Sequence, residues 1–112
     1  MADDTPRGLT RELPRYCLTL VCPPSVEEKL LDALLAHAGS EVFTSTPAYI
    51  HGTVQWRLTA TEQVMGRSRA VQVNVLLTAE ELDRLRALLQ SEFAGTGMRW
   101  WASPLAFAGK FA

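Results

Sequence analysis

Valine alternates with polar residues in the segment 70–77, and this is the clearest pattern in the chain. A period of two residues is typical of a β-strand with one buried face. Gln72 and Asn74 are expected on the less buried face of this strand. The residues expected to point into the core are Val71, Val73, Val75 and Leu77. We therefore take this strand as the centre of the predicted fold.

Three other segments also have the composition of strands: residues 15–22, 41–47 and 98–103. Both faces of 15–22 are largely apolar, which is typical of a strand inside a sheet. The segment 41–47 alternates less clearly, but it is rich in threonine, which favours strands. The sequence therefore predicts four strands, with 70–77 and 15–22 at the centre of the sheet.

Two helices are predicted, each directly after a strand. Each begins with a hydroxyl residue followed three positions later by glutamate, the pattern of a capping box. The capping pairs are Ser25 with Glu28 and Thr78 with Glu81. We expect the first helix to end at Gly39 and the second at the glycines of 95–97.

Residues 49–69 form a connection that is long for a compact domain, and such connections are often functional. Val54, Trp56 and Leu58 alternate with polar residues, which suggests a strand extension or hairpin arm. We expect one helical turn after it, capped by Thr61 and ended by Gly66.

The order of elements, strand–helix–strand twice over, defines the expected fold class. With right-handed crossovers it gives an α+β, ferredoxin-like βαββαβ domain, in which two helices cover one face of a four-stranded antiparallel sheet. The uncovered face would be half apolar and suited to contact with further copies of the chain. We expect a mobile leader over residues 1–14 and a single domain over 15–112.

Composition narrows the class of protein. The formal net charge of -1 provides no basic field, so we expect no nucleic-acid partner. No run reaches the roughly 18 apolar residues of a membrane span, and no signal peptide is recognisable, so we expect a cytoplasmic protein without membrane insertion. Cys17 and Cys22 would lie about 16 Å apart on one strand, too far for a disulfide.

The chain resembles the PII-like superfamily of small trimeric signalling proteins over roughly residues 15–105. The resemblance rests on the strand 71–77 with the Thr-Ala-Glu-Glu-Leu that follows it, and on the closing segment 97–105. It implies a homotrimer with ligand clefts between subunits, beside the base of a mobile T-loop. The segment 49–69 occupies the place of that loop.

A closer similarity is to an uncharacterised PII-like family encoded beside cobalt–zinc–cadmium-type (RND) heavy-metal efflux pumps. It rests on residues 18–24, on Thr-Glu-Gln-Val-Met-Gly-Arg-Ser-Arg at 61–69, and on the last strand. This similarity implies a link to heavy-metal resistance, with an efflux-system protein as partner.

The chain departs from nucleotide-binding PII proteins at two places. Their loop before the last strand is longer and ends in a lysine that meets phosphate, whereas here Gly95-Thr96-Gly97 is short and Arg99 stands at that position. The T-loop tyrosine that is modified in nitrogen-regulating members has no clear counterpart. Nitrogen regulation is therefore not inferred, and the effector is left open between a nucleotide and a divalent metal.

Arginines dominate the predicted ligand site. Because each guanidinium donates two parallel hydrogen bonds, such a cluster suits phosphate or carboxylate. The candidate residues are Arg57, Gln63, Arg67, Arg69 and Arg99. The simpler interpretation is that these arginines are solvated, or that they pair with Glu62 or Glu80 across a trimer.

His51 is the candidate metal ligand. One chain offers no second ligand at suitable spacing, but a three-fold axis would bring three imidazoles together. A turn histidine without a role is the alternative. Met65 and Met98 are soft potential ligands that more commonly serve packing. Of Trp100 and Trp101, one is expected in the core and the other at a subunit interface.

We expect no enzyme, because no catalytic triad, phosphate loop or metal motif is present. An RNA-binding domain of the same topology would need aromatic residues where Gln72 and Asn74 stand. The leading hypothesis is a PII-like trimer that binds a small anion or metal ion and engages a partner through its T-loop. The alternative is a non-switching structural or metal-buffering trimer similar to copper-tolerance proteins.

Overall fold

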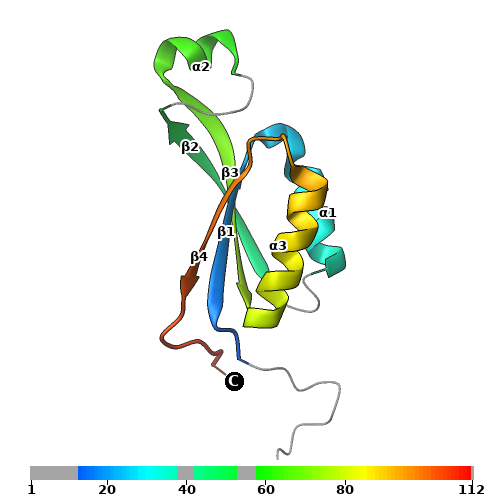
Figure 1. Ribbon diagram of the computed structural model, residues 1–112. Coiled ribbons are helices and arrows are strands. Elements are labelled where there is room, and N and C mark those ends of the chain that lie inside the picture. Colours follow the sequence, from blue (N-terminus) through cyan, green and yellow to red (C-terminus); the bar gives the residue numbers. More distant parts are fainter. Residues whose placement is uncertain (1–12, 38–41, 53–57, 112) are drawn as a thin grey trace, which may run out of the picture.

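The computed structural model of the 112-residue chain describes residues 13–37, 42–52 and 58–111 (Figure 1). The strands are β1 (Tyr16–Cys22), β2 (Phe43–His51), β3 (Arg67–Leu77) and β4 (Arg99–Pro104). The helices are α1 (Glu27–His37), preceded by the 3-10 turn η1 (Pro24–Val26), then α2 (Ala60–Met65) and α3 (Ala79–Phe93). Gly39 and residues 53–57, for which the sequence predicted a helix end and part of an arm, lie outside the described residues.

The four strands form one sheet in the order β2-β3-β1-β4, and all three neighbouring pairs are antiparallel. Helices α1 and α3 lie side by side against one face of this sheet (Figure 1). The predicted α+β, ferredoxin-like βαββαβ fold is therefore confirmed. Among the described residues, no helix is long and apolar enough to cross a membrane.

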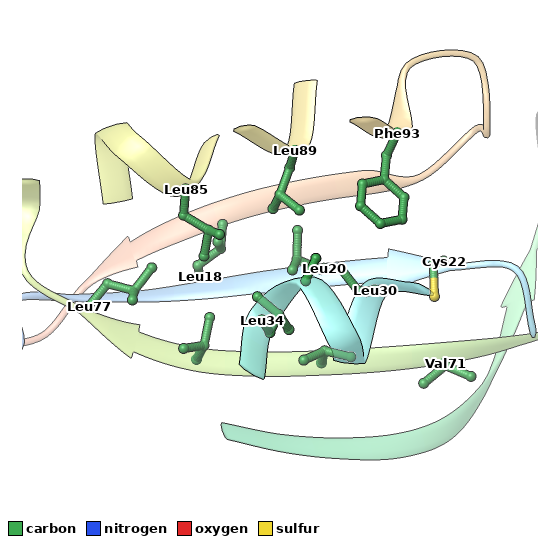
Figure 2. Packing of buried hydrophobic residues seen from close by; sticks show 13 residues of the cluster. Leu18, Leu20, Cys22, Leu30, Leu34, Val71, Leu77, Leu85, Leu89 and Phe93 are labelled. Carbon is green, nitrogen blue, oxygen red and sulfur yellow. The ribbon is translucent and has the colours of Figure 1, made fainter. Parts of the chain in front are cut away.

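A single hydrophobic core fills the space between the sheet and the two helices (Figure 2). Its buried residues come from β1, β3 and both helices, in each case from the positions that face inward. They are Leu18, Leu20, Cys22, Leu30, Ala33, Leu34, Val71, Val73, Val75, Leu77, Leu85, Leu89 and Phe93. Burial at about 25 cal/mol per Å² of apolar surface makes this cluster the main source of stability.

The alternation along β3 is confirmed. Val73, Val75 and Leu77 are completely buried on the helix-covered face, whereas Asn74 lies on the uncovered face. There Thr19 Oγ1 donates a hydrogen bond of 2.7 Å to Asn74 Oδ1. The two central strands are thus also joined by a side-chain hydrogen bond on the uncovered face.

Of the three predicted N-cap residues, one is confirmed and two are wrong. The Thr78–Glu81 capping box is present as predicted. Ser25, however, lies inside the turn η1, whose N-cap is Pro23, because the two prolines start the turn before a serine cap can form. For α2 the cap is Thr59 rather than Thr61, and Glu62 completes the capping box.

Strands β2 and β3 extend well beyond the predicted bounds, to His51 and from Arg67. Most of the described part of 49–69 is therefore a two-stranded arm that projects past α1 and α3 and carries α2 near its end (Figure 1). Gly66 ends α2 with a positive φ of 68°, a conformation that glycine adopts without a steric penalty. The strand extension suggested around Val54, Trp56 and Leu58 falls mainly outside the described residues, whereas the extension that is seen lies at the end of β2 and the start of β3.

The two tryptophans of β4 lie on opposite faces, but neither is in the core. Trp100 pairs with Leu20 on the helix-covered face and Trp101 with Thr19 on the other, and each is 48% exposed. The expectation that one is a core residue was wrong, because β4 is an edge strand beyond the reach of the helix layer. Both rings are therefore available for contacts outside the core.

Candidate functional site

The outer part of the arm holds a pocket of about 340 Å³ between α2 and the strands beneath it. Its lining combines two guanidinium groups, one carboxylate, two hydroxyls, an aromatic ring and a thioether. The lining residues are Tyr49, Thr59, Thr61, Glu62, Met65, Arg67 and Arg69. Arg67 and Arg69 come to one side because residues two apart on a strand share a face.

Glu62 holds α2 to β3 within this pocket. One carboxylate oxygen, Oε1, accepts a hydrogen bond of 3.0 Å from the Thr59 backbone N–H, and Oε2 accepts one of 2.7 Å from the Arg69 backbone N–H. These backbone donors, together with the nearby Arg69 charge, lower the pKa of Glu62 from its usual value. The carboxylate is thereby kept ionised, and it ties the short helix to the strand.

Arg67 packs its guanidinium over the ring of Tyr49, with 4.5 Å between Cζ and the ring centroid. This cation–π geometry orders a side chain that is otherwise free to rotate. Tyr49 is paired with Arg69 across the β2–β3 ladder, so the ring and both arginines lie on one face. The arrangement presents positive charge at a fixed place, as anion recognition requires.

A second hollow, of about 440 Å³, lies on the uncovered face of the sheet, where it meets the arm. Its lining is mainly apolar, with one cation and one amide. The lining residues are Val21, Ala48, Tyr49, Ile50, Ala70, Gln72, Arg99, Trp100 and Trp101. Tyr49 lines both hollows, so the two are neighbours along the arm.

Arg99 is thus separated from the other two arginines within one chain. It pairs with Val21 on the uncovered face, whereas Arg67 and Arg69 lie on the helix-covered side. Between Arg67 and Arg69 on β3, Ser68 faces the uncovered side and is 1% exposed. Its Oγ has no hydrogen-bond partner among the described residues. The structure brings two of the predicted ligand residues together and places a third on the opposite face.

The remaining predicted residues are placed as follows. Gln63 lies exposed on α2 and does not line the arginine pocket, and Arg57 is outside the described residues. His51 is exposed at the end of β2, paired with Arg67. In the described part of the chain, no three histidine, cysteine or acidic side chains gather at a distance suited to a metal ion.

The sequence did not single out Tyr49, Thr59 or Trp101 as site residues. Tyr49 was only the first residue of the long connection, since no local motif sets the register that puts it opposite Arg69. Thr59 could have been found as the residue three positions before Glu62, the spacing of a capping box. Trp101 was noted only as one of a pair.

Residues 13–112 match the DUF3240 family, whose description is a protein of unknown function. The chain belongs to the DUF3240 family. Its sequence matches no curated protein. The family match spans all of the described strands and helices, including those that line both hollows.

Solved structures of similar fold include both DUF3240 and PII-like proteins. A DUF3240 family protein from Shewanella baltica has a TM-score of 0.71 at 14% identity, covering 90% of this chain and 100% of that one. CPII, a nitrogen regulatory PII-like protein from Thiomonas intermedia solved with ADP, AMP and bicarbonate, has a TM-score of 0.66 at 14% identity, covering 88% and 97%. A putative PII-like signalling protein from Thermus thermophilus has a TM-score of 0.61 at 17% identity, covering 83% and 87%. This DUF3240 chain therefore has the PII-like fold.

Proposed function

We propose that this DUF3240 protein is a small PII-like regulatory protein that binds an anionic ligand in its arm, beneath α2, and engages a partner through the arm. The observation that carries the proposal is the convergence of Arg67 and Arg69 in one pocket beneath α2. The ADP, AMP and bicarbonate of the Thiomonas protein are anions of the kind that such guanidinium groups bind.

A homotrimer is part of the proposal. The uncovered sheet face of one chain presents a half-exposed Trp101 beside the mainly apolar hollow. Packing this face against a second copy would cover the ring and bring Arg99 of one copy towards the arm of the next. The complete ligand cleft would then lie between subunits, with positive charge from both.

The tip of the arm is suited to partner contact. Val64 is 88% exposed and Met65 is 55% exposed, and both are on α2. A ligand anion that pairs with Arg67 or Arg69 would lie beside Glu62 in the same pocket and would repel the carboxylate that holds this helix in place. Ligand binding would therefore change the position of α2, and with it the surface offered to the partner. A heavy-metal efflux component remains the partner hypothesis, and it rests on the sequence resemblance alone.

Isothermal titration calorimetry with ADP, AMP, bicarbonate and Zn²⁺ tests the proposal. We expect at least one anion to bind the wild type and to bind Arg67→Gln about tenfold more weakly, because a charge-assisted hydrogen bond is lost. Arg84→Gln, at an exposed arginine of α3 away from the pocket, is the matched control and should bind like the wild type. Unchanged affinity in Arg67→Gln would rule out this pocket. Binding of Zn²⁺ that is lost in His51→Ala would instead support a metal site.

The alternative, a non-switching structural or metal-buffering trimer, is favoured by one observation. Glu62 anchors α2 to β3, and Tyr49 orders Arg67, through contacts within the chain itself. Limited proteolysis distinguishes the two functions. A switch should show ligand-dependent cleavage between residues 49 and 69, whereas a scaffold should show the same cleavage pattern with and without ligand.

A further inference from the structure

A third pocket, of about 250 Å³, lies between α3 and β4 on the helix-covered side, away from the arginine pocket. It exists because the apolar stripe of α3 packs on β1 and β3, whereas β4 lies one strand farther out. The edge strand is therefore incompletely covered, and Trp100 remains 48% exposed. None of the residues that line the arginine pocket line this one.

The walls of this α3–β4 pocket are apolar and well fixed. Leu18 and Leu20, each 1% exposed, form part of them, and Leu89 and Phe93 point from α3 toward β1 at the same place (Figure 2). The Trp100 ring completes the wall on the β4 side. Most of the lining side chains are apolar and a few are polar, a composition in keeping with a ligand site.

The polar side chains that line the pocket belong to α3, and the charged one among them is positive. Arg86 reaches across from α3 so that its Cζ lies 6.0 Å from the centroid of the Trp100 ring, and Gln90 lies one turn farther along the helix. Within the described part of the chain, no acidic residue lines the pocket. The Arg86–Asp83 ion pair is long, at 3.6 Å, and both side chains are at least half exposed, so it contributes little. Arg86 is therefore free to pair with a ligand.

We propose that the α3–β4 pocket binds a small, flat organic carboxylate. The apolar body of the ligand would insert between Leu89 and Trp100, and its carboxylate would accept hydrogen bonds from Arg86. The charge complementarity selects an anion, because the only ionic group among the described lining residues is a guanidinium. The volume of the pocket limits the apolar part of the ligand to one or two rings, since larger ligands occupy pockets above about 300 Å³. This site is independent of the anion site beneath α2.

A pair of matched probes tests this proposal: indole-3-acetate and its neutral amide, indole-3-acetamide. Both are titrated into uniformly ¹⁵N-labelled protein and followed by NMR. We expect the acid to shift the backbone amides of Leu89, Gly95 and Trp100, and to bind about tenfold more tightly than the amide because of the pairing with Arg86. Equal binding of the two probes, shifts confined to other parts of the chain, or no binding would overturn the proposal.

Arg86→Gln provides the second test. Arg86 is exposed, so the variant is expected to fold. The NMR spectrum of the free variant checks this directly. The variant should bind the acid only as tightly as the wild type binds the amide, while its affinity for the amide stays unchanged. Arg84→Gln, which removes an exposed arginine of the same helix that does not line the pocket, should retain full preference for the acid. If the two variants behave alike, the preference is a general charge effect and the site is not the one proposed.

Discussion

Glu62 accepts a hydrogen bond of 2.7 Å from the backbone N–H of Arg69, and this contact joins the helix at the tip of the arm to the central strand of the domain. The same carboxylate completes the capping box of α2 through Thr59. The Glu62 side chain therefore caps the start of α2 and also holds α2 against β3. The position of α2 depends on this carboxylate more than on apolar packing, since α2 has no buried residue.

We predict that Glu62→Gln loosens α2 without unfolding the domain. The amide keeps one acceptor oxygen but loses the charge and the second acceptor, so the bonds to Thr59 and Arg69 can no longer both be made well. Hydrogen exchange at the Arg69 amide should become faster, while exchange at Val73 stays slow. Glu80→Gln, at an exposed glutamate in the first turn of α3, is the control and should leave both rates unchanged.

Acid should have the same local effect. The folded-state pKa of Glu62 lies below its unfolded value, so its contribution is present above the unfolded pKa and is lost as the pH falls through the folded pKa. Exchange at Arg69, corrected for intrinsic rates, should therefore accelerate in the wild type as the pH falls through the lowered folded-state pKa of Glu62. In Glu62→Gln this acceleration should be absent. An equal acid response in both proteins would show that another group controls the docking of α2.

Two adjacent leucines of α1 test how this helix packs in the hydrophobic core. Leu34 is completely buried against the sheet, whereas Leu35 is 68% exposed. Leu34→Ala should lower the free energy of unfolding by about 2–5 kcal/mol, because it removes buried methyl groups and leaves a cavity. Leu35→Ala should change it by less than about 0.5 kcal/mol. Urea unfolding followed by circular dichroism measures both, and similar losses in the two variants would contradict the packing of α1.

Cys22 should resist alkylation in the folded protein. Burial, and secondarily the charge of Glu27, raises the pKa of its thiol to about 11, so the reactive thiolate is scarce at pH 8. Iodoacetamide should modify Cys22 only after unfolding, as mass spectrometry of the digested protein would show. Because the folded pKa is the higher one, the neutral thiol favours the folded state below the unfolded pKa near 9, and this contribution is lost as the pH rises towards 11.

The two tryptophans of β4 offer a test of assembly. If the uncovered face forms the proposed trimer, Trp101→Ala should shift the molecular mass measured by light scattering towards that of a monomer. Trp100 has equal exposure and also lines the hollow, but it pairs on the helix-covered face, so Trp100→Ala should shift the mass less than Trp101→Ala does. A wild type that is monomeric at every concentration tested would remove the trimer from the proposal.

The body of the domain was predicted well because its elements have clear hydrophobic periods. The valines of β3 and the stripe of α3 that contains Leu85 and Leu89 could be assigned to the core from their spacing alone. The sequence suggested an arm around Val54, Trp56 and Leu58 but did not locate the paired segments seen at the ends of β2 and β3. Four of the nine residues of β2 are threonine, serine or proline, which give little contrast between buried and exposed faces. The strands of the arm are held by backbone pairing, which leaves no hydrophobic pattern in the sequence.

The ligand site was predicted only in part for a related reason. Arg67 and Arg69 could be grouped because their spacing puts them on one face of any strand. The position of Arg99 depends on the pairing of β4 with β1, and that of Tyr49 on the pairing of β2 with β3. Neither register is encoded in a local motif. The α3–β4 pocket was not found either, since it depends on how far one helix reaches across the sheet.

Strand β3 pairs with β2 in one constant register from Arg67 to Val75, and with β1 from Val71 to Leu77. The same backbone thus belongs first to the arm and then to the centre of the domain, with no bulge in these paired residues at which one could pivot against the other. A protein that pulls on α2 would consequently twist the sheet itself instead of swinging a hinged appendage. Binding at the tip should for that reason be detectable as small, graded chemical-shift changes that reach as far as the valines beneath α1.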